Sequence, residues 1–200
     1  MDKLIFDFDG VLADSLEAHA NFYADWGRKH NLVITRDQAQ TAMMGSIETY
    51  FAMLGVPDHL RDGMESDYAS DFANYSCQLF PGIQEALDEL SRHNAVITLA
   101  SSNRRPFIEK HIKPIGRHFR LVKTRDEHYY KSDAIANIIQ TLGGNTWDYT
   151  LIGDTQWDID TSQRAGVNFH GAGWGWHKLK STHQYQVSAT PQEMVRALIG

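Results

Sequence analysis

The spacing of hydrophobic residues differs between the first and second parts of the chain. A short apolar and aromatic run beginning at Leu4 is typical of a β-strand. The stretch that follows has apolar residues three or four positions apart, which is typical of amphipathic helices, and residues 15–79 contain no clear strand pattern. We therefore expect a helical insertion after the first strand. Its predicted helices are residues 17–30, 38–44, 47–54 and 60–75.

Beyond residue 79, short apolar runs alternate with helical patterns. Pro81 suits the first turn of a helix. Alternation of this kind predicts a parallel sheet covered by helices on both faces, an α/β fold of the Rossmann-like type. We therefore predict a core domain of residues 1–14 and 80–200, and a small all-helical cap domain of residues 15–79. The predicted elements of the second part are strands at 95–100, 119–123, 149–152 and 167–170, and helices at 105–115, 133–142, 157–165 and 192–199.

Composition and charge narrow the classes of partner. The 200 residues are 42% hydrophobic and 22% charged, which is enough apolar material for a sizeable core. The formal charge is −6 and there is no long basic run, so we expect no nucleic-acid partner. No apolar run reaches membrane-spanning length, and the one cysteine, Cys77, cannot form an internal disulfide. We expect a cytoplasmic monomer or weak dimer without a membrane partner.

The first candidate for chemistry follows the first strand. Asp7 and Asp9 stand two residues apart, and Gly10 allows a sharp turn directly after them. Two close carboxylates repel each other unless a positive charge lies beside them, and Mg²⁺ accepts carboxylates together with phosphate oxygens. A strand followed by a polar turn is the alternative interpretation.

Polar residues also follow the other predicted strands. Parallel strands bring their carboxyl ends to one edge of the sheet, where ligands bind. Each residue has an ordinary alternative, such as a helix cap or a surface lysine, but together they fit a metal and a phosphate. The residues are Ser101, Ser102 and Asn103 after the second strand, Lys131 at the helix after the third, and Asp154 and Asp158 after the fourth.

The order of these motifs resembles that of the haloacid dehalogenase-like hydrolase superfamily. Residues 7–12 (Asp-Phe-Asp-Gly-Val-Leu) resemble its first motif, Ser101 its second, Lys131 its third and residues 153–159 its fourth. The insertion resembles the type-one cap of phosphoglycolate phosphatases and beta-phosphoglucomutases, and the Gly-Trp-Gly-Trp segment at 173–176 resembles the phosphoglycolate-phosphatase-like branch. One departure is Ser132, where relatives often carry proline.

The resemblance implies a phosphatase that works through an aspartyl-phosphate. Asp7 would be the nucleophile, Asp9 the general acid and base, and Lys131 a catalytic cation that also binds phosphate. Phosphate oxygens would also be bound by Ser101, Ser102 and Asn103. The implied cofactor is Mg²⁺, held by Asp7, the backbone carbonyl of Asp9, Asp154 and, through a water or from outside, Asp158.

A small phosphorylated metabolite is the expected substrate, and cap residues would select it. The candidates are His19, Arg36, Met43 and Met44. Two other functions stay open. One is a phosphosugar mutase of the beta-phosphoglucomutase type, although such mutases carry glutamate where this chain has Gly153 and lack a counterpart of Asp158. The other is a non-enzymatic phosphorylatable signalling module.

Overall fold

The computed structural model describes residues 3–44 and 49–199. The chain forms two compact units, Met1–Asp14 with Leu79–Gly200, and Ser15–Gln78. The return to the first unit lies one residue before the expected position. No helix of the described residues is long and apolar enough to cross a membrane.

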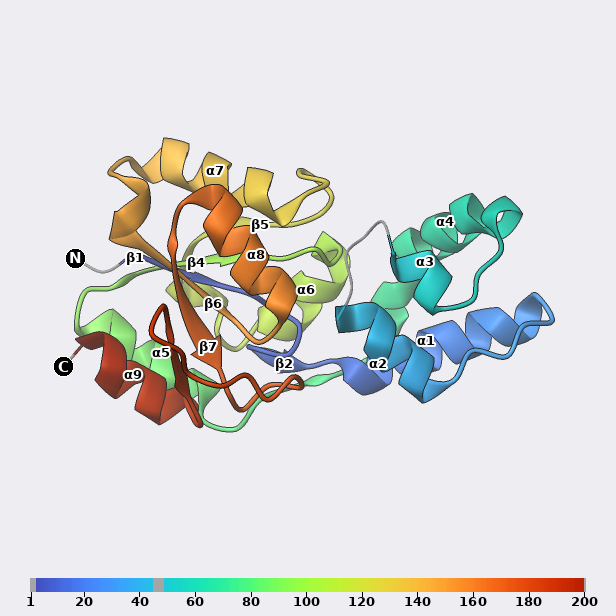
Figure 1. Cartoon of the computed structure of the whole chain (residues 1–200), viewed down its shortest axis with the longest axis horizontal. Coiled ribbons are helices and arrows are strands. Elements are labelled where there is room, and N and C mark those ends of the chain that lie inside the picture. Colours follow the sequence, from blue (N-terminus) through green and yellow to red (C-terminus); the bar gives the residue numbers. More distant parts are fainter. Residues whose placement is uncertain (1–2, 45–48, 200) are drawn as a thin grey trace. The chain divides into compact units, whose positions relative to one another are not determined.

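The first unit is built on a six-stranded sheet in the order β5-β4-β1-β6-β7-β8 (Figure 1). Every neighbouring pair in it is parallel. The predicted α/β fold with a parallel sheet is therefore confirmed. The strands are β1 (Lys3–Phe6), β4 (Val96–Ala100), β5 (Phe119–Lys123), β6 (Tyr149–Gly153), β7 (Asn168–Ala172) and β8 (Gln186–Ser188).

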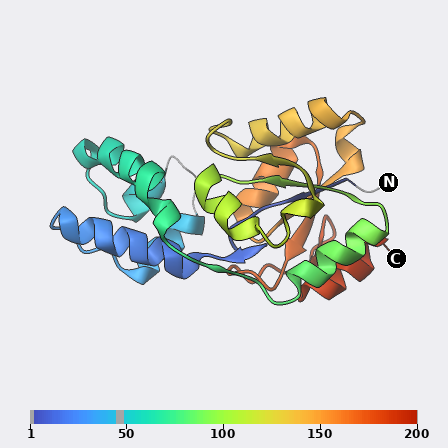
Figure 2. The ribbon, with the colours of Figure 1, turned by 180° about the vertical axis from the view of Figure 1, so that it is seen from behind.

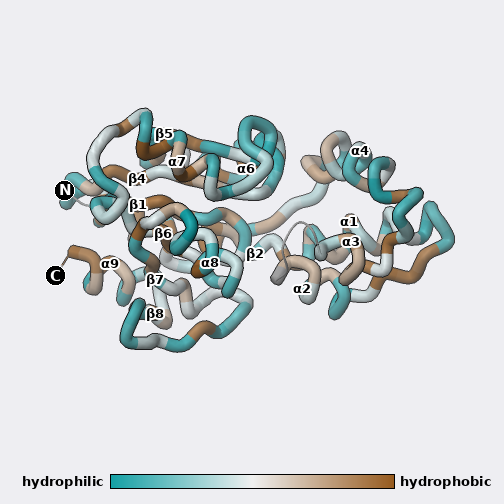
Figure 3. The backbone as a smooth tube through the Cα atoms, turned by 45° about the horizontal axis from the view of Figure 1, so that its top comes forward, coloured by the Kyte–Doolittle hydropathy of each residue, from teal (hydrophilic) through white to brown (hydrophobic). Residues whose placement is uncertain are grey.

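Helices cover both faces of this sheet. Two of them, α7 and α8, pack together over one face, whereas α5 and α9 pack together over the other (Figures 1 and 2). The core beneath α7 includes Ile5, Ile135 and Leu151, which are fully buried. In Figure 3, brown hydrophobic segments of the backbone lie along β1 and β4. The helices are α5 (Ile83–Arg92), α6 (Arg105–Ile112), α7 (Lys131–Leu142), α8 (Gln156–Ala165) and α9 (Pro191–Ile199).

Several element boundaries differ from the sequence prediction. The pattern did not predict β8, a three-residue strand at the edge of the sheet. Two further short strands, β2 (Ala13–Asp14) and β3 (Gln78–Leu79), pair where the insertion begins and ends. The helix expected at 105–115 ends at Ile112 and is followed by a 3₁₀ turn.

The second unit is helical, with an aromatic cluster at its centre. His19 is buried and packs 4.5 Å from the Phe72 ring, and its Nδ1 lies 3.4 Å from the Tyr23 hydroxyl. The Trp26 indole donates to Asp67 Oδ2 at 3.0 Å. The elements are α1 (Leu16–Lys29), α2 (Arg36–Met44), α3 (Tyr50–Met53), α4 (Arg61–Asp71) and two 3₁₀ turns, Asp58–Leu60 and Phe72–Asn74.

The cap residues expected to select substrate have different environments. His19 lies in the aromatic cluster, Arg36 forms an ion pair with Glu17, and the Met43 sulfur accepts from the Tyr23 hydroxyl at 3.9 Å. The side chain of Met44 lies outside the described residues, as do residues 47 and 48 of the helix expected at 47–54. A role for these four residues in substrate selection stays a prediction.

Candidate active site

Backbone pairing at the centre of the sheet places the first-motif aspartate. Strand β1 lies between β4 and β6, and Phe6 pairs with Leu99 on one side and Ile152 on the other. The next residue, Asp7, continues this pairing, since its N–H donates to the Ile152 carbonyl at 3.0 Å. Asp154 directly follows β6. The sheet thus brings together aspartates that are about 150 residues apart in sequence.

Three aspartates and one lysine form a buried cluster at this edge. Asp7, Asp154 and Asp158 each offer a carboxylate oxygen within 4.8 Å of the others. The Lys131 ammonium contacts Asp7 Oδ2 at 2.8 Å and Asp158 Oδ1 at 2.7 Å. All four side chains are buried, and Asp154 and Asp158 have no exposed area. The cluster therefore combines three potential negative charges with one positive charge away from water.

This imbalance perturbs the titration of the cluster. Burial, opposed by Lys131 and reinforced by Asp158 and Asp9, raises the pKa of Asp7 from 3.8 to about 7. Burial and the neighbouring Asp158 and Asp7 carboxylates also hold the pKa of Asp154 well above its usual range. Burial alone would lower the pKa of Lys131, but Asp158 and Asp7 together raise it. The site thus disfavours its own negative charge and favours a cation.

The donor atoms suit a hard cation such as Mg²⁺. Asp154 Oδ1 is buried and has no hydrogen-bond partner among the described residues, whereas Oδ2 accepts from the Trp176 N–H at 2.9 Å. A buried carboxylate oxygen without a partner is costly unless something else binds it. Mg²⁺ prefers carboxylate oxygens and is held in proteins by a few of them. The residues present therefore fit the predicted ion.

Asp158 serves both the local structure and the cluster. Its Oδ2 accepts from the Thr155 N–H at 3.2 Å and from the Thr155 hydroxyl at 2.7 Å, and Thr155 in turn caps α8. Its Oδ1 faces Lys131. The helix-cap interpretation of this segment is thus correct for one oxygen, and the other remains for the site.

The Asp9 carboxylate lies outside the cluster of Asp7, Asp154 and Asp158. Both of its oxygens accept from Asn103 Nδ2, at 3.1 Å each. Asn103, predicted to bind substrate, is buried, and its Oδ1 accepts from the Arg104 N–H. The structure therefore places the Asn103 amide where it orients Asp9. The backbone carbonyl of Asp9 stays a predicted metal ligand.

The two predicted phosphate-binding serines differ in exposure. Ser101 is buried, and its hydroxyl oxygen accepts from the Asn103 N–H at 3.0 Å, which leaves the hydroxyl proton for a ligand. Ser102 is exposed. Ser101 follows β4, the strand beside β1, so the expected convergence of strand ends is observed for it.

The loop after β7, residues 173–176, contributes contacts that sequence reasoning did not predict. The Trp174 indole donates to the Val11 carbonyl at 2.9 Å, and the Trp176 N–H binds Asp154. The only sequence signal for this loop was its Gly-Trp-Gly-Trp pattern, and a backbone donor has no sequence signature.

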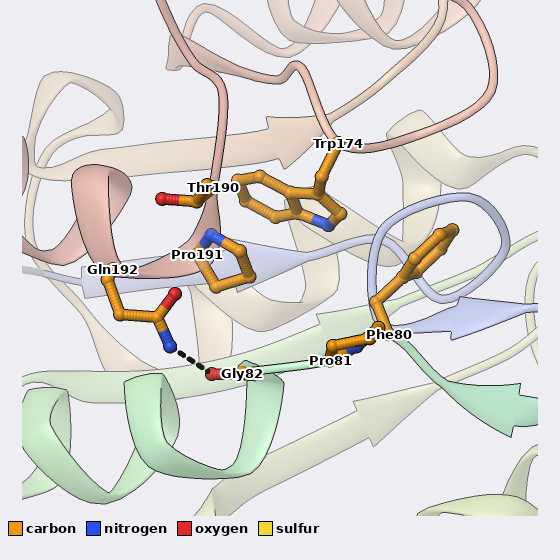
Figure 4. A pocket seen from close by; sticks show the side chains of 7 residues that line it. All are labelled: Phe80, Pro81, Gly82, Trp174, Thr190, Pro191 and Gln192. Atoms are coloured by element: carbon orange, nitrogen blue, oxygen red, sulfur yellow. Dashed lines mark hydrogen bonds between the residues drawn. The ribbon is translucent and has the colours of Figure 1, made fainter.

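Trp174 also borders a cavity of about 460 Å³ (Figure 4). Its apolar wall comes from Trp174, Phe80, Pro81 and Pro191. None of the predicted site residues lines it, so it is distinct from the carboxylate cluster.

Comparisons with known proteins agree with this geometry. The sequence profile of the haloacid dehalogenase-like hydrolases matches residues 4–172. A phosphoglycolate phosphatase from Synechococcus elongatus is 26% identical over 189 residues, which cover 90% of this chain and 88% of that protein.

Solved structures share the fold across the whole chain. A candidate phosphoglycolate phosphatase from Lactobacillus plantarum has a TM-score of 0.87 at 20% identity, covering 98% of this chain and 99% of the other. A haloacid dehalogenase-like family hydrolase from Streptococcus pneumoniae has a TM-score of 0.84 at 21% identity, covering 98% of both chains. The chain belongs to the haloacid dehalogenase-like hydrolase family. Within that family it is an enzyme of the phosphatase type, which removes the non-enzymatic signalling module as an interpretation.

Proposed function

We propose that this enzyme is a Mg²⁺-dependent phosphatase that hydrolyses a small organic phosphate monoester through an aspartyl-phosphate. The observation that carries the proposal is the buried cluster of three carboxylates and one lysine, in which one oxygen of Asp154 has no partner among the residues that the structure describes. Clusters of this composition suit phosphoryl transfer, in which positioning and charge stabilisation provide most of the catalysis.

The metal would be held chiefly by Asp7 and Asp154. Asp158 accepts from three donors, Lys131 and the N–H and hydroxyl of Thr155, whereas Asp7 accepts from two, and this difference supports the predicted role of Asp158 outside the direct ligand shell. When bound, Mg²⁺ would offset the charge of the carboxylates, so that an anionic nucleophile and a phosphate can approach each other.

Asp7 is the proposed nucleophile. A carboxylate oxygen attacks phosphorus, the ester P–O bond breaks, and Asp9 gives its proton to the leaving alcohol. Asp9 then takes a proton from the water that attacks the phosphorus of the aspartyl-phosphate, which releases inorganic phosphate and regenerates Asp7. Asn103 supports this role, because its amide holds both oxygens of Asp9.

Lys131 provides a positive charge in addition to that of the metal. Its ammonium contacts Asp7 Oδ2 and Asp158 Oδ1, so it can neutralise a phosphate oxygen next to the nucleophile. The Ser101 hydroxyl is available as a further donor to phosphate.

The substrate we propose is a small phosphorylated metabolite such as phosphoglycolate or a sugar phosphate. The relative from Synechococcus elongatus, named a phosphoglycolate phosphatase, makes 2-phosphoglycolate the first compound to test.

A phosphomutase is less well supported. A Cβ atom at Gly153 would lie 2.4 Å from the Asp158 Cβ and 2.6 Å from its Cγ. The glutamate found at this position in the mutases that the chain resembles therefore has no room while Asp158 occupies its present place.

The test measures phosphate release from a panel of phosphorylated metabolites with Mg²⁺, and traps the intermediate by borohydride reduction. We expect turnover of small monoesters and homoserine at position 7. Asp133→Asn, which alters an exposed aspartate near Lys131, is the matched control for Asp7→Asn. Homoserine at another position, or turnover by Asp7→Asn similar to that of the control, would overturn the mechanism.

A further inference from the structure

We propose that Trp176 is a positioning residue that links the metal ligand Asp154 to Asp14, the last residue before the helical insertion. The link consists of two hydrogen bonds donated by one residue. The backbone N–H of Trp176 donates to Asp154 Oδ2 at 2.9 Å, and its indole Nε1 donates to Asp14 Oδ1 at 2.9 Å. The inference rests on the proposed Mg²⁺ site.

The backbone hydrogen bond determines which oxygen of Asp154 is available. Since Oδ2 is held by Trp176, Oδ1 is left buried without a partner among the described residues. A carboxylate held at one oxygen presents the other in a fixed direction, and this lowers the ordering cost of binding an ion. A shift of Trp176 would therefore change the direction of the free oxygen.

Gly175, the residue before Trp176, packs closely against Gly10 and Asp154. A Cβ atom at Gly175 would lie 2.4 Å from the Gly10 carbonyl oxygen and 2.5 Å from the Asp154 Cβ. The Gly175 N–H donates to the Ala172 carbonyl at 3.1 Å, which ties the loop to the end of β7. The loop is thus held up to residue 175 by contacts that a side chain there would prevent.

The segment that follows Trp176 in the sequence has no regular secondary structure. No helix or strand occurs among residues 177–185, all of which the structure describes. The indole hydrogen bond to Asp14 restrains the Trp176 side chain on this side, beside the Lys178 ammonium, which donates to the Gly175 carbonyl at 3.1 Å. Because Ser15 begins the second unit, this bond also connects the proposed metal ligand to the residue directly before the insertion.

Trp176→Phe tests the link, because it removes the indole N–H and keeps an aromatic ring and the backbone N–H. We expect Mg²⁺ binding, measured by calorimetry without substrate, to weaken about 3- to 10-fold. This is less than the 10- to 100-fold typical of groups that contact metal ligands directly, because the indole acts through the backbone. Trp147→Phe, which changes a largely exposed tryptophan, is the control and should bind Mg²⁺ as the unmodified protein does.

Asp14 variants separate the hydrogen bond from other effects. Asp14→Ala should weaken Mg²⁺ binding as much as Trp176→Phe, and Asp14→Asn, which keeps an acceptor oxygen, should restore it to within about twofold of the unmodified protein. The double variant Trp176→Phe/Asp14→Ala should bind no more weakly than either single variant, because both remove one interaction. The urea midpoint in EDTA should change little in Trp176→Phe, whereas a purely structural role would lower it.

Besides a lowered urea midpoint of Trp176→Phe, four results would overturn the proposal. Trp176→Phe could bind Mg²⁺ as tightly as the control, or the two single effects could multiply in the double variant. Asp14→Asn could be as weak as Asp14→Ala, which would assign the effect to charge alone. Finally, absence of Mg²⁺ binding by the unmodified protein would overturn both this inference and the proposed metal site, whereas the first three results leave the metal site in place.

Discussion

Replacing the proposed nucleophile should make the metal-free protein more stable at neutral and alkaline pH. Asp7 is buried, and its pKa is raised from 3.8 to about 7, mainly by burial. At pH values between about 3.8 and 7, the folded state binds more protons at Asp7 than the unfolded state does. The free energy of unfolding therefore falls as pH rises through this range. The contribution of the protonated Asp7 carboxyl is fully present only below about pH 3.8.

The size of the effect follows from the same shift. At 1.36 kcal/mol for each pH unit, the difference between 3.8 and about 7 corresponds to a penalty on the order of 4 kcal/mol above pH 7. Asp7→Asn removes this charge but disturbs one of two contacts, with the Phe8 N–H or with Lys131, at a cost of about 1 kcal/mol. We expect a net gain of about 3 kcal/mol at pH 8 in EDTA, or roughly 6–12 °C in Tm for a chain of this length.

The assay is urea unfolding followed by circular dichroism in EDTA from pH 4.5 to 8.5. The advantage of Asp7→Asn over the unmodified protein should grow with pH and level off above pH 7, whereas Asp133→Asn should show no such trend. Saturating Mg²⁺ should stabilise the unmodified protein more than the variant, because Asp7 is a proposed ligand. A difference between the two proteins that stays constant with pH in EDTA would refute the argument that burial of an unmatched charge dominates this site.

Three further predictions concern activity and the shape of the site. Asp9→Asn should slow turnover about 10²–10⁴-fold for alkyl phosphates and much less for p-nitrophenyl phosphate, and equal losses on both substrates would contradict a role in proton transfer. EDTA should abolish phosphate release, Mg²⁺ should restore it, and Ca²⁺ should inhibit it through its looser coordination; full activity after exhaustive EDTA dialysis would exclude the metal. Gly175→Ala should lower the free energy of unfolding by about 1–3 kcal/mol and weaken Mg²⁺ binding, because the new methyl group would clash with Gly10 and Asp154. Wild-type values in both measurements would show that the loop can move aside.

The parts of the site that could be predicted are side chains placed by the sheet. Asp7, Ser101 and Asp154 directly follow β1, β4 and β6, and neighbouring parallel strands bring their carboxyl ends to one edge. The positions could be predicted because the strands are apolar runs with clear ends. The contact between Lys131 and Asp7 depends in addition on the start of α7, which the helical pattern indicated within two residues.

Other features had no usable sequence signal. Strand β8 has only three residues, two of them polar, and lies at the edge of the sheet, where alternation or a continuous apolar run is not required. The Trp176 contact to Asp154 uses a backbone N–H, which almost every residue has. The Asn103 contact to Asp9 joins two turns whose conformations depend on the packed core.

The strongest reason to expect a cation arises from burial, which composition does not reveal. The whole chain carries a formal charge of −6, but most of its acidic residues can be solvated at little cost. At the carboxylate cluster, three aspartates and one lysine would carry a net charge of −2 if all were ionised, and all four side chains are buried. Binding protons or binding a metal would relieve this charge, and only the second would leave Asp7 ionised for the proposed attack. The instability predicted for the metal-free cluster and the reactivity proposed for Asp7 would therefore have one physical cause.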